Sequence, residues 1–133
     1  MIIDGSVAFK WLIDEPGSEA AVGWIGRTSL LAPKLAISEV GNALSKRVRR
    51  GEIDGARAGE MLSKLGSILD YVDESPHMER ALVLSIELNH SIYDCVYLAL
   101  AEELSEKLLT ADRKFVAKLG DLARHVELLE TCL

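Results

Sequence analysis

Short apolar runs alternate along the chain with longer stretches in which apolar residues recur every three or four positions. The short runs predict five strands, at residues 1–3, 30–32, 69–72, 108–110 and 126–129. The longer stretches have the spacing of amphipathic helices, most clearly at 36–50, 54–67, 76–88 and 94–104. Because parallel strands need a crossover between them, this alternation favours a mostly parallel sheet. We therefore expect a single α/β domain, residues 1–133, built as a three-layer α/β/α sandwich around five strands.

Four acidic residues stand where strands lead into helices or where helices begin. Asp4 follows the first strand and Asp112 follows the fourth, whereas Glu39 and Asp94 lie near the starts of two helices. Each has a local alternative, because acidic side chains commonly cap or favour helix N-termini, and Ser91 with Asp94 resembles a capping box. For Asp4 alone, the cap is the better interpretation. In a parallel sheet, however, all four positions can converge at one edge, where ligands bind.

Four converging carboxylates predict a metal site. Without cations they would repel one another in a partly desolvated pocket. Hard divalent cations remove this repulsion, and ligands that are all oxygen select Mg²⁺ or Mn²⁺ over zinc. The chemistry that fits such a site is phosphodiester hydrolysis by an activated water, which needs no side-chain nucleophile. The histidines, His77, His90 and His125, have no metal-ligand spacing, and we expect them at the surface or as helix caps.

Composition narrows the class of protein only slightly. Fifteen basic and 21 acidic residues give a net charge of −6, which argues against binding nucleic acid through the whole surface but allows a local basic groove. No apolar run approaches a membrane span and no leader precedes the first strand, so we expect a cytoplasmic protein without membrane contact. Cys95 and Cys132 are far apart and form no CxxC. We expect Cys95 in the core and Cys132 as a free thiol.

A basic stripe follows Glu39 along its predicted helix. Lys46 and Arg50 share the face of Glu39, and Arg47 lies beside them. The stripe could hold RNA phosphates next to the metal, or it could be ordinary solvated charge; the sequence leaves both open. With Arg113, which follows Asp112, the candidate RNA-binding residues are Lys46, Arg47, Arg50 and Arg113. Tyr93 and Tyr97 could stack on bases, although core or interface packing is the simpler interpretation.

Four segments, in order and at matching spacing, resemble the PIN domain family and specifically the VapC-type toxins of bacterial and archaeal toxin–antitoxin pairs. They are Ile3-Asp4-Gly5-Ser6-Val7, Ser38-Glu39-Val40-Gly41-Asn42-Ala43-Leu44, Ile92-Tyr93-Asp94-Cys95-Val96-Tyr97 and Leu108-Leu109-Thr110-Ala111-Asp112-Arg113. Together they span nearly the full chain. One departure is Gly5, where the family more often has alanine or threonine, and which should loosen the turn without removing a ligand.

The resemblance implies a sheet of strand order 3-2-1-4-5 and a Mg²⁺- or Mn²⁺-dependent endoribonuclease. It also implies a homodimer held inactive by a cognate antitoxin that occupies the active-site groove. The site residues that it implies are the metal ligands Asp4, Glu39, Asp94 and Asp112, with Ser6 and Thr110 as supporting hydroxyls. Asp112 is the least secure of the acids, since the family's fourth position varies most, and Asp121 is a remote substitute for it.

Two other classes of protein compete with the ribonuclease. A catalytically silent PIN-like module that binds RNA or a protein would share the fold, but the intact set of four acids argues against it. A phosphoacceptor receiver domain has a similar size and strand alternation. It needs paired acids after its first strand and a lysine after its fifth, whereas Asp4 stands alone and no lysine follows Leu129. The receiver interpretation is therefore discounted.

Overall fold

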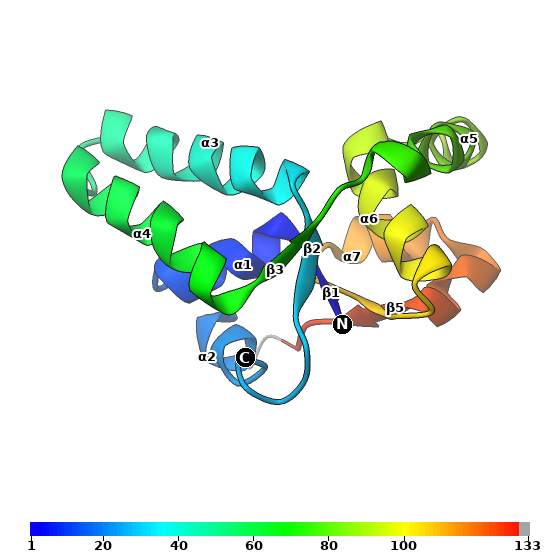
Figure 1. The fold of residues 1–133 in the computed structure, drawn as a ribbon, viewed down its shortest axis with the longest axis horizontal. Helices are drawn as coiled ribbons and strands as arrows, with labels where there is room; N and C mark the ends of the chain where they lie inside the picture. Colours follow the sequence, from blue (N-terminus) through cyan, green and yellow to red (C-terminus); the bar gives the residue numbers. More distant parts are fainter. Residues whose placement is uncertain (131–133) are drawn as a thin grey trace.

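A five-stranded, wholly parallel sheet forms the centre of the molecule, seen here in a computed structural model that describes residues 1–130 (Figure 1). Its strand order is β3-β2-β1-β4-β5. The strands are β1 (Ile2–Ile3), β2 (Leu31–Pro33), β3 (Asp70–Val72), β4 (Leu108–Thr110) and β5 (Val126–Leu128). The parallel sheet and its order confirm the predicted architecture.

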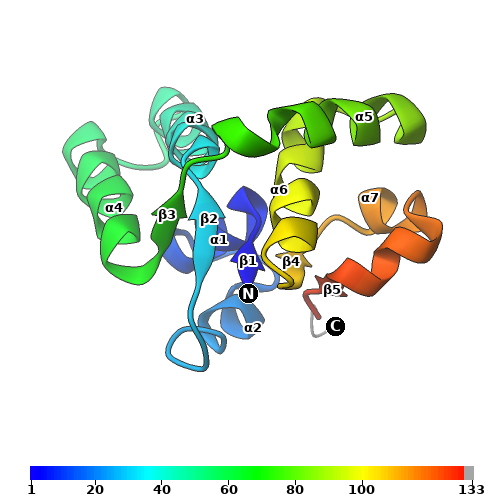
Figure 2. The ribbon, with the colours of Figure 1, turned by 45° about the vertical axis from the view of Figure 1, so that its right-hand side comes forward.

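Helices surround this sheet and connect its strands. They are α1 (Gly5–Leu12), α2 (Ser18–Val22), α3 (Leu35–Arg49), α4 (Gly55–Ile68), α5 (Met78–Leu88), α6 (Ile92–Glu103) and α7 (Arg113–Ala117), with 3₁₀ turns at Ser75–His77 and Gly120–His125. Right-handed crossovers place α1 to α4 over one face and α5 to α7 over the other. Figure 2 shows the α3–α4 hairpin on the far side of β2 and β3 from α6, α7 and β5. None of the described helices is long and apolar enough to cross a membrane.

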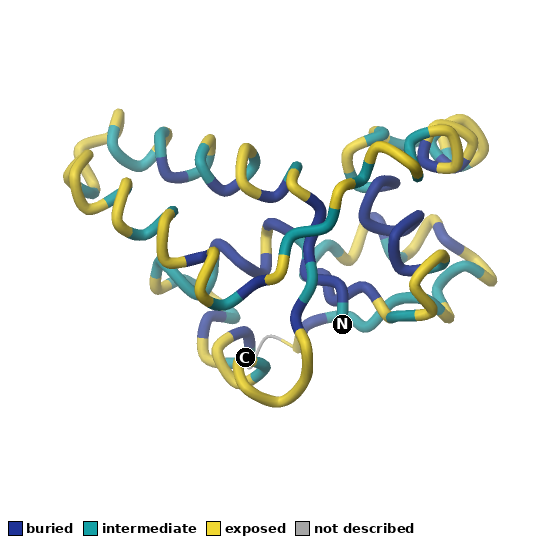
Figure 3. The backbone as a smooth tube through the Cα atoms, viewed as in Figure 1, coloured by how far each residue is buried: buried dark blue, intermediate teal, exposed yellow. Residues whose placement is uncertain are grey.

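Helix α6 is the most buried helix, as its nearly all-apolar sequence predicts. All seven residues from Cys95 to Ala101 are buried (Figure 3), and the helix packs against β1, β2 and β4. Burial raises the pKa of the Cys95 thiol to about 11, so this cysteine is a core residue, as predicted, rather than a reactive thiolate. Cys132, predicted to be a free thiol, lies outside the described residues.

The centre of the sheet brings two strand ends together. β1 pairs with β4 through Ile3 and Leu109, and the backbone N–H of Asp4 donates to the carbonyl of Leu109 at 3.0 Å. The chain leaves β1 toward β2 on one side, whereas β4 leads to β5 on the other. The crevice beyond the strands at such a reversal of order is where open α/β sheets bind ligands.

The element boundaries differ from the predicted ones by a few residues. The second strand, predicted at 30–32, runs from Leu31 to Pro33. Because β1 pairs with β2 only at Leu31, the missing N–H of Pro33 costs no hydrogen bond to β1. The predicted helix at 94–104 already begins at Ile92, with Ser91 as its N-cap. The turn at Gly120–His125 was not predicted, because its short apolar pattern resembles neither a helix nor a strand.

Candidate active site

Asp4 is both a helix cap and the centre of a hydrogen-bonded cluster. It is the N-cap of α1, where its Oδ1 accepts from the backbone N–H of Ser6 at 3.4 Å. Its Oδ2 accepts from the Ser6 hydroxyl at 3.1 Å and from the Thr110 hydroxyl at 2.6 Å. The cap and the functional interpretation therefore describe the same side chain, and the predicted hydroxyls Ser6 and Thr110 both contact it.

Thr110 ties the ends of the two central strands together. It is the last residue of β4 and has no exposed surface. While its hydroxyl donates to Asp4, the same oxygen accepts from the backbone N–H of Asp112 at 3.1 Å. A single buried hydroxyl thus fixes the Asp4 carboxylate relative to the turn that carries Asp112.

Glu39 is held by Tyr97, a residue that the sequence placed either in the core or stacked on an RNA base. The Tyr97 hydroxyl of α6 donates to Glu39 Oε1, although the two residues are 58 positions apart. Burial and the charge of Glu39 raise the pKa of Tyr97, so the phenol stays protonated and donates. Only 1% of Tyr97 is exposed, whereas Tyr93, the other candidate, is 59% exposed.

Gly5 provides the space for this contact. A Cβ at Gly5 would lie 3.2 Å from the Tyr97 hydroxyl oxygen and 3.4 Å from both Cβ and Oε1 of Glu39. The departure from the family's usual alanine or threonine therefore leaves room for the Tyr97–Glu39 pair. The expected loosening of the turn is a smaller matter, because Gly5 is a buried first residue of α1.

Asp94 contacts a histidine that was expected at the surface or in a cap. In place of the predicted capping box, Asp94 Oδ2 lies 2.6 Å from His90 Nε2, while Ser91 alone caps α6 through the N–H of Tyr93. His90 precedes the helix, and its side chain is only 15% exposed. The expectation for His90 was wrong because it considered metal-ligand spacing and not contact with a candidate ligand.

Three of the four acids influence one another electrostatically. Burial raises the pKa of Asp4 above its usual range; the Thr110 hydrogen bond opposes this rise and the charge of Asp94 adds to it. Burial likewise raises the pKa of Glu39; its bond to Tyr97 opposes the rise, and the charges of Asp4 and Asp94 add to it. Asp4, Glu39 and Asp94 therefore lie close enough to repel, as predicted for a converging set.

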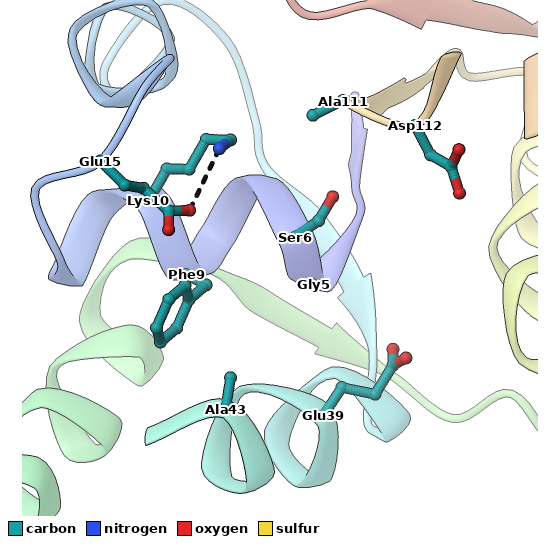
Figure 4. A pocket seen from close by; sticks show the side chains of 9 residues that line it. All are labelled: Gly5, Ser6, Phe9, Lys10, Glu15, Glu39, Ala43, Ala111 and Asp112. Carbon is teal, nitrogen blue, oxygen red and sulfur yellow. Dashed lines mark hydrogen bonds and ion pairs between the residues drawn. The ribbon is translucent and has the colours of Figure 1, made fainter. Parts of the chain in front are cut away.

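Asp112 lies at the wall of an adjacent pocket. Its Oδ1 accepts from the backbone N–H of Phe115 at 3.0 Å, so it caps α7. Figure 4 shows Ser6, Glu39 and Asp112 around one end of this pocket, with Lys10 of α1 and its partner Glu15, from the segment after α1, at the other end. The pocket has a volume of about 360 Å³, and its other lining residues are Gly5, Phe9, Ala43 and Ala111.

The acids present an oxygen donor set that could hold a hard cation. Within residues 1–130 no three acidic, histidine or cysteine side chains form a ready-made metal cluster. The carboxylates of Asp4, Glu39 and Asp94 are instead anchored separately, each by an uncharged donor or a ring nitrogen. Their mutual repulsion would be relieved by a divalent cation, and carboxylate oxygens are the ligands that Mg²⁺ and Mn²⁺ prefer.

The basic residues near the site differ in how freely their charges face solvent. Lys46, Arg50 and Arg113 are exposed. Arg47 is paired with Glu15 at 3.2 Å and with Glu52 at 3.1 Å. Glu15 also binds Lys10 at 3.1 Å. The sequence interpretation missed this cluster because Glu15 stands at a helix break, which normally indicates a solvated acid, and its partners are far along the chain.

Comparison with known proteins places this geometry in a family. The family model of the PIN domain matches residues 1–119. The chain is 31% identical over 126 residues to Ribonuclease VapC3 of Pyrobaculum aerophilum, a match that covers 92% of this chain and 96% of that protein. It is 36% identical to Ribonuclease VapC1 of Mycobacterium tuberculosis, with 67% of each chain covered. It is 35% identical to Exonuclease VapC9 of Pyrobaculum aerophilum, with 71% of each covered.

A solved structure agrees with the fold. The crystal structure of PAE2754 from Pyrobaculum aerophilum superposes with a TM-score of 0.73 at 27% identity, over 92% of both chains. The family-model match, residues 1–119, includes all four acids, Asp4, Glu39, Asp94 and Asp112. The chain therefore belongs to the PIN domain family, among its VapC-type members.

Proposed function

We propose that this chain is a metal-dependent endoribonuclease, the toxin of a toxin–antitoxin pair acting in the cytoplasm. The observation that carries the proposal is the convergence of Asp4, Glu39 and Asp94, whose carboxylates repel one another at the carboxyl edge of the sheet. The relatives named Ribonuclease VapC3 and Ribonuclease VapC1 support RNA as the substrate. The alternative is a catalytically silent PIN-like module that binds RNA or a protein.

In this proposal the acids hold Mg²⁺ or Mn²⁺, and each protein group has a positioning task. Asp4, Glu39 and Asp94 are the ligands, with Asp112 at the edge of the same site. When bound, the cation would lower the pKa of a water molecule and stabilise charge on the scissile phosphate. Ser6 and Thr110 hold the Asp4 carboxylate in place through two hydroxyl hydrogen bonds. Tyr97 orients Glu39 through the space that Gly5 leaves.

The RNA would lie along the pocket beside α1 and α3. Lys46, Arg50 and Arg113 are exposed and can contact phosphates without breaking an ion pair. Arg47 can do so only by exchanging Glu15 or Glu52 for a phosphate, because both acids already bind it. We assign Arg47 to the same RNA-binding surface and propose that a phosphate replaces one of these two acids when RNA binds. A cognate antitoxin would inhibit the enzyme by occupying this groove.

An apolar strip on α5 supports the proposed homodimer. Leu82, Val83 and Ile86 are 51%, 43% and 71% exposed. Residues three and four apart are neighbours on a helix, so these three side chains form one strip. Contiguous exposed apolar surface in a globular protein typically marks an interaction site. A second copy of the chain is the partner that fits the family, and we assign the strip to that contact.

Replacing Asp4 or Asp94 by Asn is expected to reduce RNA cleavage about 100-fold or more, beyond the loss typical of a change outside the ligands. Asn keeps the side-chain size and, at position 4, still caps α1, but it carries no charge to hold a cation. Cleavage is measured with MnCl₂, with and without a chelator, on linear and circular RNA of one sequence. Asp70→Asn, an exposed acid at the start of β3, is the control and should keep full activity.

The outcomes of this experiment separate the candidate functions. Cleavage of the circle indicates an endonuclease, whereas cleavage of the linear RNA alone would indicate an exonuclease, as the name of Exonuclease VapC9 describes that relative. Retained cleavage in both Asn variants would refute the proposed ligands. A wild-type protein that cleaves neither RNA with Mn²⁺ would favour the silent module.

The metal-free Asp4→Asn protein is expected to be more stable than the wild type at pH 7. A raised pKa means that the folded state disfavours the charged carboxylate, so the charge costs stability above the raised pKa. The gain should shrink as the pH falls through the raised pKa, and it should vanish only below the ordinary value of 3.8, where both the folded and the unfolded state are protonated. Thermal unfolding at pH 7 and near pH 4 measures this, and an equal or lower Tm for the variant at pH 7 would contradict it.

Gly5→Ala should destabilise the protein by about 1–3 kcal/mol, the usual cost of overpacking a buried site. The cost should shrink in a Tyr97→Phe background, because the nearest atom to the new Cβ, at 3.2 Å, is the tyrosine hydroxyl. Urea unfolding of the wild type, both single variants and the double variant forms the cycle. Gly59→Ala, in open space on α4, is the control and should not destabilise. If the losses of stability in the two single variants simply add up in the double variant, the glycine is not needed to make room for the Tyr97 hydroxyl.

Ile86→Lys should convert a dimer to a monomer, because it places a charge in the centre of the α5 strip. Size-exclusion chromatography with light scattering measures the mass at several protein concentrations. Glu87→Lys, which changes the charge by two units at the neighbouring exposed position, is the control. A wild type that is monomeric at all concentrations, or an Ile86→Lys variant that remains dimeric, would contradict the assignment.

A further inference from the structure

The His90 side chain is held from several directions next to a candidate ligand. Its backbone N–H donates to the Ser85 carbonyl at 3.1 Å, and its carbonyl accepts from the Ser85 hydroxyl, so the residue is fixed to the end of α5. Its ring packs against Phe115 of α7, with the ring centroids 4.6 Å apart. Both ring nitrogens have partners, Asp94 at Nε2 and Lys118 at Nδ1. These contacts from α5, α6 and α7 fix the orientation of the ring.

Lys118 determines which ring nitrogen of His90 carries the proton. Its Nζ lies 3.2 Å from Nδ1 and donates also to the Asn89 carbonyl at 3.2 Å. An ammonium group has donors and no acceptor, so Nδ1 must accept. The ring proton of the neutral imidazole then lies on Nε2, which donates to Asp94 Oδ2 across 2.6 Å. The contact at Asp94 is therefore a directed hydrogen bond from the ring.

We propose that His90, with its tautomer set by Lys118, is a positioning residue that holds the Asp94 carboxylate for cation binding. Within residues 1–130 no protein donor engages the second oxygen, Oδ1, so it is available to a cation while Oδ2 is held. Hydrogen-bonded partners outside the ligands fix ligand orientation in metal sites, and their loss typically weakens metal affinity about 10- to 100-fold. The inference rests on the proposed function, because it takes Asp94 as a ligand.

Mn²⁺ binding to the full-length, metal-free protein, measured by calorimetry, is the first test. His90→Ala should weaken Mn²⁺ affinity about 10-fold or more. His90→Gln, whose amide Nε2 can supply the N–H at a similar position, should recover much of it. Unfolding curves establish that each variant is folded. Unchanged affinity in His90→Ala, or equal losses in His90→Ala and His90→Gln, would overturn the proposal.

The tautomer is tested without metal or RNA. In ¹⁵N-histidine NMR spectra, the wild type should show His90 protonated at Nε2 and not at Nδ1. Lys118→Met should move the ring toward a mixture of tautomers and weaken Mn²⁺ affinity, but it should add nothing in the His90→Gln background. Lys114→Met, an exposed lysine of α7, is the matched control. An Nδ1-protonated His90 in the wild type would overturn the role of Lys118.

The two proposals fail in different ways. A wild-type protein that binds no Mn²⁺ would refute the proposed metal-dependent function. A wild type that binds Mn²⁺ and cleaves RNA, with His90→Ala binding the ion equally well, would refute only the positioning role.

Discussion

Repulsion among Asp4, Glu39 and Asp94 is the constraint on which the rest of the site depends. Each carboxylate comes from a different element. Burial raises the pKa of Asp4 and of Glu39, and the charges of the neighbouring acids add to that rise. Such an arrangement costs folding free energy and persists only because the surrounding structure holds it. The wholly parallel sheet supplies that structure, since it brings the end of β1 and the starts of α3 and α6 to one edge.

The protein holds these acids in place without neutralising them. Asp4 is bound by the hydroxyls of Ser6 and Thr110, Glu39 by the phenol of Tyr97, and no lysine or arginine within residues 1–130 forms an ion pair with either. Lys10, which lines the neighbouring pocket, is paired with Glu15, and Arg47 binds the same acid. The carboxylates are thus oriented by hydrogen bonds and not neutralised by a lysine or arginine, an arrangement that leaves their oxygens available to a divalent cation.

The sequence predicted the fold and the placement of the candidate acids better than it predicted the contacts that hold those acids. Strand order, the buried α6 and the positions of Asp4, Glu39 and Asp94 follow from periodicity, from the sheet edge and from the PIN-like segments. The supporting contacts depend on distance in space: Tyr97 meets Glu39 from 58 positions away, and Gly5 matters only because both approach it. His90 was within reach of prediction, since it lies four residues before Asp94. It was missed because it precedes the helix, where a spacing of four residues does not by itself predict a contact.

The net charge of −6 is also less informative than the placement of the charges. The acids of the site account for part of the negative charge, and a bound cation would offset them locally. On α3, Lys46 and Arg50 remain exposed beyond Glu39. An RNA following this helix would therefore meet the bound cation at one end of its path and these two basic side chains at the other. Arg47 differs from them because its bonds to Glu15 and Glu52 must be exchanged for a phosphate. Under the proposed function, that exchange would make the contribution of Arg47 to RNA affinity smaller than its charge suggests, because each bond gained would replace one already formed.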